Sequence, residues 1–354
     1  MRFLSGFLKD IPRGFRGSAR SSGNFSGAFR APNSIRFASY KRFNGNNQPI
    51  NITRLLYNRN SIYVGLGLVG FYIYNLDEAP FTHRRRFLWI PYWMEEKIGD
   101  YSYKQILWQY QDQVVPATDP VYNKISKIMN RLLTVALTNE NLSQLVEQLL
   151  DTQRKHLQNL NWTIHVVKVD AQTPPNAFIL PNGKIFIFSS ILPICRDDNG
   201  LATVLSHELS HQLAHHTSEQ LSLQPFYIIL STALYTMTGI SWFNDLLIEG
   251  LLRMPSSREM ESEADRIGCE LLARLCFNVE LAIDFWLRMQ KFEESMGGPA
   301  GAGVLQEFLS THPATTKRIK DIKEWLPELQ NVREASGCNE YQWRSFNMGR
   351  NFFK

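Results

Sequence analysis

The sequence predicts an α+β domain that is mainly helical with a small sheet, preceded by an N-terminal region of different composition. Residues 161–170 alternate as a strand does, and residues 176–192 read as a hairpin with Pro181, Asn182 and Gly183 at its turn. Apolar residues at helical spacing fill much of the chain on either side, for example in residues 124–137. With 354 residues, 44% of them hydrophobic, the chain can bury one sizeable core or two modest ones.

The N-terminal region is basic and almost free of acid. The chain carries a net charge of +5, and Asp10 is the only acidic residue before Asp77. Residues 1–44 are rich in Arg, Ser, Gly and Phe, a composition typical of a mitochondrial transit peptide. A disordered basic tail that binds nucleic acid or acidic lipid is the alternative. Because the basicity belongs to this tail and not to a patch on the main domain, we expect no nucleic-acid partner.

Residues 61–76 form an uncharged apolar run between Arg59 and Asp77. Tyrosines near its ends and glycines within it are common in membrane helices, although the run is slightly short of the about 20 residues expected for a span. We predict a single transmembrane anchor here, with a buried core helix or a pair of strands as the alternative. Residues 77–100 would form a juxtamembrane segment and residues 101–354 the main domain. A second apolar run, residues 226–243, contains several Ser and Thr residues and favours a buried or membrane-contacting helix pair over a span.

The stretch VLSHELSHQLAHH (residues 204–216) carries the chemistry. His207 and His211 lie four residues apart, so both face the same side of a helix and can give one imidazole nitrogen each to a zinc ion. Glu208, directly after His207, is placed to take a proton from a water molecule that attacks a peptide carbonyl. The alternative is a polar helix whose histidines face solvent.

A zinc site of this kind needs a third protein ligand. Thr217 occupies the position at which a metzincin has its next histidine, and His215 and His216 fall at the wrong offset, so we expect these two at a helix end. Downstream, SSREMESEADRIG (residues 256–268) places Glu261 and Asp265 four residues apart on one helical face. We predict that Glu261 completes the coordination and that Asp265 orients a ligand histidine from behind.

The remaining residues of this helix support the same interpretation. Ala264 and Gly268 are small and allow it to approach the histidine helix closely, whereas Glu259 and Glu263 point elsewhere and are expected to be solvated or salt-bridged. The sequence therefore predicts one Zn²⁺ per chain, held by two histidines and a glutamate as in a gluzincin-like zincin.

Three motifs together resemble a known family. HELSH, SREMESEAD and STHPATTKRI (residues 310–319) are similar to those of the membrane metallopeptidases of the HtpX and CAAX-prenyl-protease type. With the transit-like start and the single early anchor, the resemblance is to the mitochondrial inner-membrane, Oma-type branch, and it covers residues 81–327. It implies that His207, His211 and Glu261 are the metal ligands and that Glu208 is the general base.

The third motif adds two residues. The resemblance implies that His312 and Arg318 face the substrate carbonyl, whereas spacing alone identifies His312 only as a loop histidine before Pro313. It also implies that the substrate lies as an extended strand along the edge of the active-site sheet, at a segment that matches Asn176, Ala177 and Phe178. Main-chain pairing there would accept many sequences. An ordinary core hairpin is compatible with this role.

The four cysteines show no metal-ligand spacing. In an oxidising compartment, a bridge between Cys338 in the tail and Cys276, at the end of the helix that carries Glu261, would tie the tail to that helix. Cys269 is an alternative partner, and four free buried thiols are the other possibility.

The resemblance implies a zinc-dependent endopeptidase of the mitochondrial inner membrane. It would cleave misfolded or stress-exposed membrane proteins and process a dynamin-like fusion GTPase, with its N-terminus in the matrix and its peptidase domain in the intermembrane space. Expected partners are these substrates, the lipid bilayer and, by analogy, further copies of the chain in a homo-oligomer. Two alternatives are weaker. A prenyl-protein peptidase of the endoplasmic reticulum would have several clear spans and no transit-like start, and a non-catalytic client-binding scaffold would usually have lost Glu208.

Overall fold

The computed structural model describes residues 58–79, 83–138, 151–170, 173–239, 254–295, 316–338 and 352–353. The predicted transit segment, residues 1–44, and His312 lie outside these ranges. The chain forms two compact units, Met1–Ile73 and Tyr74–Lys354. The segment predicted to be juxtamembrane, residues 77–100, therefore belongs to the same unit as the main domain.

The predicted anchor region is a helix, α2 (Arg59–Tyr74), with no buried residue. It ends before Leu76, where strand β1 (Leu76–Glu78) begins. Its large apolar side chains are exposed, Leu66 and Ile73 among them. Within the ranges given above, no helix combines the length and the apolar character that crossing a membrane requires.

A short hairpin opens the larger unit. Strand β1 pairs antiparallel with β2 (Arg85–Phe87), and Asp77 lies opposite Arg86. Arg86 is buried and donates hydrogen bonds to the Asp77 carboxylate and to the carbonyl of Ala214, so the hairpin is fixed to a distant part of the chain. Helix α3 (Tyr92–Tyr110) and a 3₁₀ turn, η3 (Gln111–Gln113), follow.

The predicted strands form a three-stranded sheet in the order β3-β5-β4. Strand β3 (Thr163–Val167) pairs parallel with β5 (Lys184–Phe188), and β4 (Ala177–Ile179) pairs antiparallel with β5. Gly183 adopts φ +79°, which glycine accepts without strain, at the turn of the hairpin that the sequence predicted. The small sheet within a mainly helical domain is confirmed, and β4 lies at its edge.

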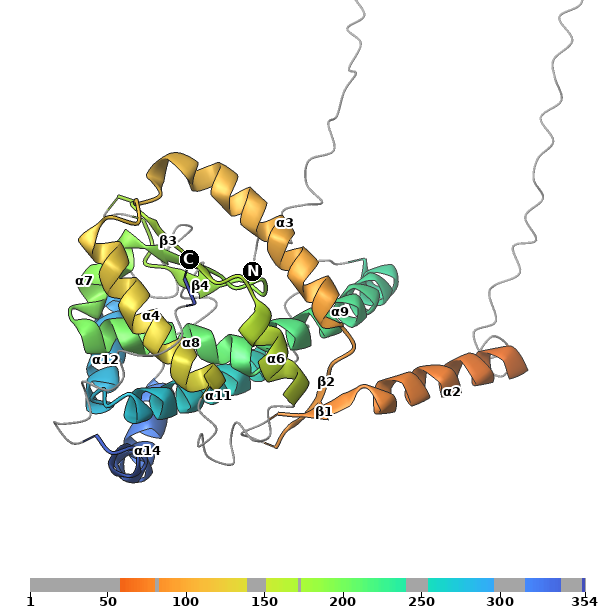
Figure 1. The fold of residues 1–354 in the computed structure, drawn as a ribbon. Coiled ribbons are helices and arrows are strands. Elements are labelled where there is room, and N and C mark those ends of the chain that lie inside the picture. Colours follow the sequence, from red (N-terminus) through yellow and green to blue (C-terminus); the bar gives the residue numbers. More distant parts are fainter. Residues whose placement is uncertain are drawn as a thin grey trace, which may run out of the picture. The chain divides into compact units, whose positions relative to one another are not determined.

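Helices make up the rest of the described chain. They are α4 (Pro120–Thr138), α6 (Asp151–Asn159), η4 (Ser189–Ile191), α7 (Leu192–Cys195), α8 (Asp198–Leu213), α9 (His216–Thr238), α11 (Met254–Arg274), α12 (Glu280–Ser295) and α14 (Thr316–Ala335). Helix α8 is central: it packs against α11, α12, α4 and the edge strand β4 (Figure 1).

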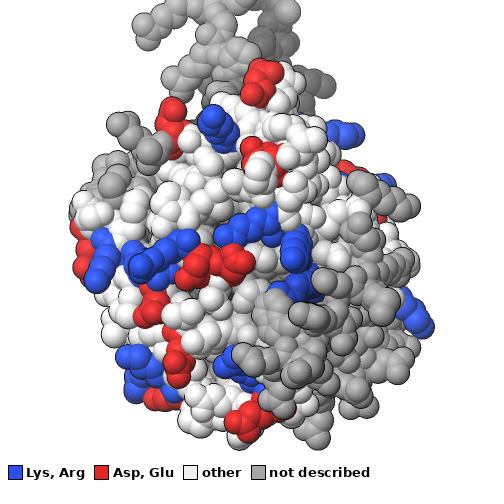
Figure 2. Space-filling view, turned by 60° about the vertical axis from the view of Figure 1, so that its left-hand side comes forward, with Lys and Arg blue, Asp and Glu red and all other residues white. Residues whose placement is uncertain are grey.

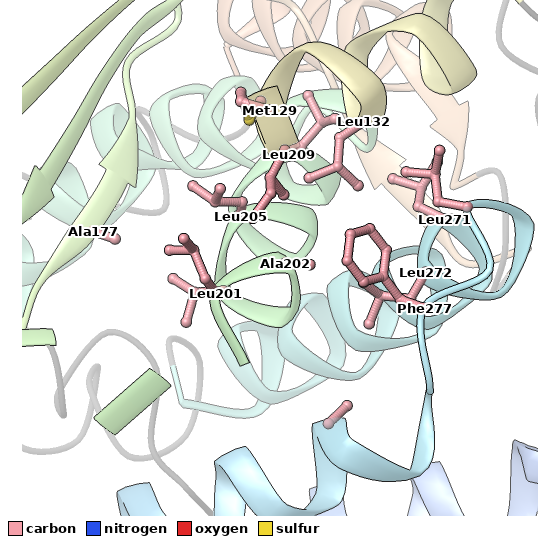
Figure 3. Close-up of a cluster of buried hydrophobic side chains, with 14 of the residues drawn as sticks. Met129, Leu132, Ala177, Leu201, Ala202, Leu205, Leu209, Leu271, Leu272 and Phe277 are labelled. Atoms are coloured by element: carbon pink, nitrogen blue, oxygen red, sulfur yellow. The ribbon is translucent and has the colours of Figure 1, made fainter. Parts of the chain in front are cut away.

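The core explains why α8 takes this central position. Leu201, Leu205 and Leu209 recur at every fourth residue of α8 and are buried, so one face of the helix is continuously apolar. Met129 from α4 and Leu272 from α11 lie in the same buried cluster (Figure 3). Helix α8 thus has apolar contacts on several sides, and the polar residues of its remaining face are buried with it.

Helix α9 differs between its two halves. Its first turns are buried, whereas Phe226, Ile229 and Met237 in the second half are 45%, 67% and 83% exposed. The hydroxyls of Thr232 and Thr238 donate to backbone carbonyls four residues earlier. Of the two alternatives that the sequence left open for residues 226–243, a buried helix pair is therefore wrong for the part up to Thr238, and contact with a membrane stays a prediction. Residues 240–253 lie outside the described ranges. Unlike this apolar half of α9, the face drawn in Figure 2 carries acidic and basic side chains that are interspersed.

One disulfide is present in the described part of the chain. It joins Cys276, just after α11, to Cys338, just after α14, across 62 residues. This is the pairing that the sequence favoured. Cys195 and Cys269 are free and buried.

Candidate metal centre

Helix α8 positions the two histidines and the glutamate between them. The Asp197 side chain caps the helix by accepting a hydrogen bond from the Gly200 amide at 3.0 Å. Along the helix, His207 and His211 turn toward the same side, with their Nε2 atoms 3.1 Å apart. Glu208 is 5% exposed and therefore also belongs to the buried interior.

Helix α11 brings the third candidate ligand. The Glu261 carboxylate lies 3.3 Å from His207 Nε2 and 3.4 Å from His211 Nε2. One donor atom from each of these residues lies within 4.8 Å of the others, the spacing of ligands around a single ion. The predicted ligand set is therefore brought to one point by two separate helices.

A glycine allows the two helices to come this close. A Cβ atom at Gly268 of α11 would stand 3.3 Å from the backbone nitrogen of His207 and from the Ser206 hydroxyl. This is tighter than ordinary van der Waals contact, so glycine at this position sets the approach of α11 to α8. Ala264, one turn earlier, is fully buried, as the sequence led us to expect.

Asp265 and Arg318 stand behind His207. The Asp265 carboxylate lies 3.0 Å from His207 Nδ1, the ring nitrogen that faces away from the ligand cluster. Arg318, on α14, donates two hydrogen bonds of 2.6 Å to the same carboxylate and lies 3.1 Å from Glu261. Its guanidinium stacks 3.5 Å over the ring of Trp286. Arg318 thus holds the carboxylates of Asp265 and Glu261 in place from behind the cluster.

His211 has its own partner at the ring nitrogen that faces away from the cluster. His216, the first residue of α9, places its Nδ1 2.8 Å from His211 Nδ1, and its Nε2 lies 3.2 Å from the Glu263 carboxylate. Both His216 and Glu263 are buried. The sequence did not indicate this pair. His216 follows a short turn at His215, whose φ of +57° ends the helical register that the motif defines.

The electrostatics of the cluster favour one positive charge. Burial and the Arg318 charge oppose protonation of His207, but hydrogen bonds with Asp265 and Glu261 outweigh them and raise its pKa to about 9. Burial lowers the pKa of His211 to about 4. Burial also works against ionisation of Asp265, yet Arg318 and His207 lower its pKa. Without a metal ion, the cluster therefore favours a protonated His207 beside a neutral His211.

The donor set fits a divalent metal ion. Imidazole nitrogens and a carboxylate are the ligands that Zn²⁺ takes in metallopeptidases, three from the protein with a further position open. His207 and Glu261 are buried, and His211 is partly exposed, so the cluster has one side that solvent or a substrate can reach.

The other predicted residues fall into two groups. Asn176, Ala177 and Phe178 lie at and within edge strand β4, and the Gln212 side chain of α8 donates to the Ile179 carbonyl at 3.0 Å, tying this edge to the metal-binding helix. His312 lies outside the described residues.

The chain is similar to a known family and to named proteins. The model of peptidase family M48 matches residues 136–326. The chain is 41% identical over 349 residues to mitochondrial metalloendopeptidase OMA1 of Saccharomyces cerevisiae, which covers 94% of this chain and 96% of that protein. It is 34% identical over 277 residues to the protein of the same name from Schizosaccharomyces pombe (77% of this chain, 73% of that protein). It is 26% identical over 285 residues to metalloendopeptidase OMA1, mitochondrial, of Homo sapiens (77% of this chain, 50% of that protein). The chain therefore belongs to peptidase family M48, among the metalloendopeptidases of the OMA1 group.

Proposed function

We propose that this chain is a zinc-dependent endopeptidase of the mitochondrial inner membrane that cleaves misfolded or stress-exposed membrane proteins. The observation that carries the proposal is the convergence of His207, His211 and Glu261 on one point, with Glu208 adjacent on the same buried helix. The three relatives named above are all called mitochondrial metalloendopeptidases, which supports a mitochondrial location for this chain.

The chemistry assigns a separate role to each group. Zinc, when bound, supplies Lewis acidity toward the peptide carbonyl and the attacking water. Glu208 takes the proton of that water and passes it to the departing amine. Asp265 holds His207 with its Nδ1–H directed away from the metal, so that Nε2 is the nitrogen offered as ligand.

The edge strand supports a substrate that binds through its main chain. In the register with β5, Phe178 pairs with Phe186, and the Asn176 carbonyl accepts from the Phe188 amide. Because antiparallel partners alternate, the main-chain groups of Ala177 point away from β5. An extended peptide that paired with Ala177 would lie beside α8 and would bind with little demand on its side chains, which suits cleavage of many unfolded sequences.

The exposed apolar helices support the membrane part of the proposal. Helix α2 and the second half of α9 both present large apolar side chains outside the core. The Thr hydroxyls of α9 bond to carbonyls of their own helix, which is how hydroxyls are accommodated in an apolar environment. The topology we propose places the N-terminus in the matrix and the peptidase domain in the intermembrane space.

The activity is tested with the full chain purified in detergent and an unfolded protein substrate. We expect cleavage that stops on chelation and returns with zinc. Glu208→Gln should keep about one zinc per chain while the rate falls by about 10²–10⁴-fold, the usual contribution of a general base. Glu261→Gln should lose zinc first and activity as a consequence. Glu294→Gln, an exposed acid of α12, is the matched control and should behave like the parent. Full cleavage by Glu208→Gln would refute the assigned mechanism.

The location is tested separately. Mitochondria that carry a C-terminally tagged chain are opened to give mitoplasts and treated with protease. Loss of the tag supports the proposed topology, and protection of the tag would reverse it. Recovery of the chain in endoplasmic-reticulum fractions would favour the prenyl-protein peptidase instead.

A further inference from the structure

We propose that His216 is a positioning residue for the metal ligand His211. We also propose that Arg84 of the β1–β2 hairpin stabilises Glu263, the carboxylate that His216 contacts. This inference rests on the proposed metal site, because it assigns to His211 the role of ligand. It extends the metal centre to a segment that lies before residue 136, where the match to the peptidase family begins.

The first link joins the two imidazoles. His211 Nε2 faces the Glu261 carboxylate and His207, so it is the nitrogen available to a metal. A neutral imidazole that ligates through Nε2 carries its proton on Nδ1. His211 Nδ1 therefore donates to His216 Nδ1, 2.8 Å away, and that atom must be an unprotonated acceptor.

The second link follows from the first. Since His216 accepts at Nδ1, its own proton lies on Nε2, which points to the Glu263 carboxylate at 3.2 Å. Both hydrogen bonds therefore point the same way: His211 donates to His216, and His216 donates to Glu263. His216 and Glu263 are each 1% exposed, so water does not compete for these bonds.

The third link brings in the hairpin. Arg84, directly before β2, donates to both oxygens of Glu219 at 2.5 Å and 2.8 Å and lies 3.2 Å from Glu259 and 4.0 Å from Glu263. Its guanidinium thus compensates the charge of the carboxylate that receives the His216 proton. Without it, two buried carboxylates, Glu219 and Glu263, would lose the positive charge that lies within 4.0 Å of each.

The same hairpin holds the turn between α8 and α9. Arg86 donates to the Ala214 carbonyl, at the point where α8 ends and two residues before His216. The hairpin therefore fixes both the backbone that presents His216 and the carboxylate that His216 contacts. Replacing either His216 or Arg84 should therefore leave the His211 ring more free to rotate away from the orientation in which it binds metal.

The test compares matched neighbours in the full, detergent-purified chain. His216→Phe keeps a ring of similar volume without the Nδ1 acceptor. His215→Asn is its control, because His215 is buried next to it but has no contact with a ligand, and Asn tolerates the left-handed backbone there. Arg84→Met and the exposed neighbour Arg85→Met form a second pair.

Three quantities are measured: zinc affinity by competition with a chromophoric chelator, the visible absorption spectrum of the Co²⁺-loaded chain, and the melting temperature of the metal-free chain. We expect His216→Phe to weaken zinc binding by about 10–100-fold, as loss of a group that orients a ligand commonly does, and to change the Co²⁺ spectrum. Arg84→Met should act in the same direction by a smaller factor. His215→Asn and Arg85→Met should match the parent.

The outcomes separate this inference from the proposed function. A parent chain that holds no zinc refutes the metal site and the inference with it. A parent that binds zinc, together with a folded His216→Phe of parental affinity and parental Co²⁺ spectrum, refutes the inference alone. If His216→Phe does not fold, Glu263→Gln decides, because it keeps the shape of the side chain and removes its charge. A parental spectrum in that variant overturns the proposal.

Discussion

The two histidines of the metal centre are oriented by different groups. His207 contacts a carboxylate, Asp265, through its Nδ1, and His211 contacts another imidazole, His216, through the equivalent atom. A carboxylate that accepts the Nδ1 proton's hydrogen bond increases the electron density of the ring and makes its other nitrogen a stronger metal ligand. A neutral imidazole acceptor does so less. The two ligands are therefore not equivalent, and His207 should be the stronger of the pair.

Arg318 supplies a prediction at this scale. Its guanidinium donates to both oxygens of Asp265 and stacks on Trp286, which a lysine ammonium on a flexible stem cannot reproduce. We expect Arg318→Lys to weaken zinc binding by about 10-fold and to lower cleavage in proportion. The exposed Lys320→Met on the same helix serves as control. Parental zinc affinity in Arg318→Lys, measured by chelator competition, would count against a positioning role.

A second prediction concerns Glu95, on α3. Burial raises its pKa from 4.5 to about 7, so the folded chain binds a proton more tightly than the unfolded chain. Its contribution to stability is complete below pH 4.5 and is lost as the pH rises through about 7. Glu95→Gln should therefore raise the free energy of unfolding at pH 8 by up to about 3 kcal/mol, with little effect near pH 4.

Denaturant unfolding at the two pH values measures this effect. The partly exposed Glu96→Gln is the control, since the same charge is removed without the burial. An equal gain for Glu95→Gln at both pH values would show that titration of Glu95 is not its cause.

At the scale of elements, the site depends on how closely three helices pack. α8 carries two of the proposed ligands and α11 the third, while α14 brings Arg318 to the back of both helices. Spacing within one helix is fixed by its period of 3.6 residues, which is why HELSH and the Glu261–Asp265 pair could be predicted from the sequence. Contacts between helices have no such period. His216 contacts the site from beyond the turn that ends α8, and Arg84 from a distant hairpin, and no local pattern marks either residue.

The disulfide gives a prediction for two of these helices. It ties Cys276, shortly after α11, to Cys338, shortly after α14, across a sequence separation of 62. In the chain-entropy description such a loop stabilises the fold by about 4 kcal/mol. We expect Cys276→Ser to lower the melting temperature and to weaken zinc binding, because α14 and its Arg318 are held less firmly on α11.

Reductant provides the comparison for that variant. The parent in reductant should melt like Cys276→Ser in either condition, and reductant should not change the variant. A parent that melts at the same temperature with and without reductant would contradict a stabilising bridge.

For the whole molecule, the small sheet, the order of strands and helices, and the two motifs that meet at the metal centre followed from the sequence. Two features did not. The first is that residues 77–100, predicted to be a juxtamembrane segment, form one compact unit with the main domain, in which Arg84 and Arg86 bind groups of α9 and the α8–α9 junction. The second feature is the exposed second half of α9, for which the sequence had left a buried and a membrane-contacting helix pair open. An apolar composition alone does not distinguish a side chain that packs in a core from one that is presented outward.

The exposed half of α9 supplies the prediction at this scale. With the chain reconstituted into phospholipid vesicles, Ile229→Cys should react slowly with a water-soluble maleimide and rapidly once detergent replaces the bilayer. Lys320→Cys, on the exposed side of α14, should react rapidly in both. The native free thiols, Cys195 and Cys269, are buried and set a low background. Equal labelling of Ile229→Cys in vesicles and in detergent would exclude contact of α9 with lipid.

The place of Arg318 in the last described helix also bears on timing. A chain emerges from synthesis or translocation with its N-terminus first, and the ligands of α8 and α11 precede Arg318 by more than fifty residues. Until α14 has docked and Cys338 has met Cys276, the buried carboxylates of Glu261 and Asp265 lack the guanidinium that they share. We therefore expect the metal centre to be completed late in the folding of the chain, and the proposed peptidase activity to appear only after α14 has docked.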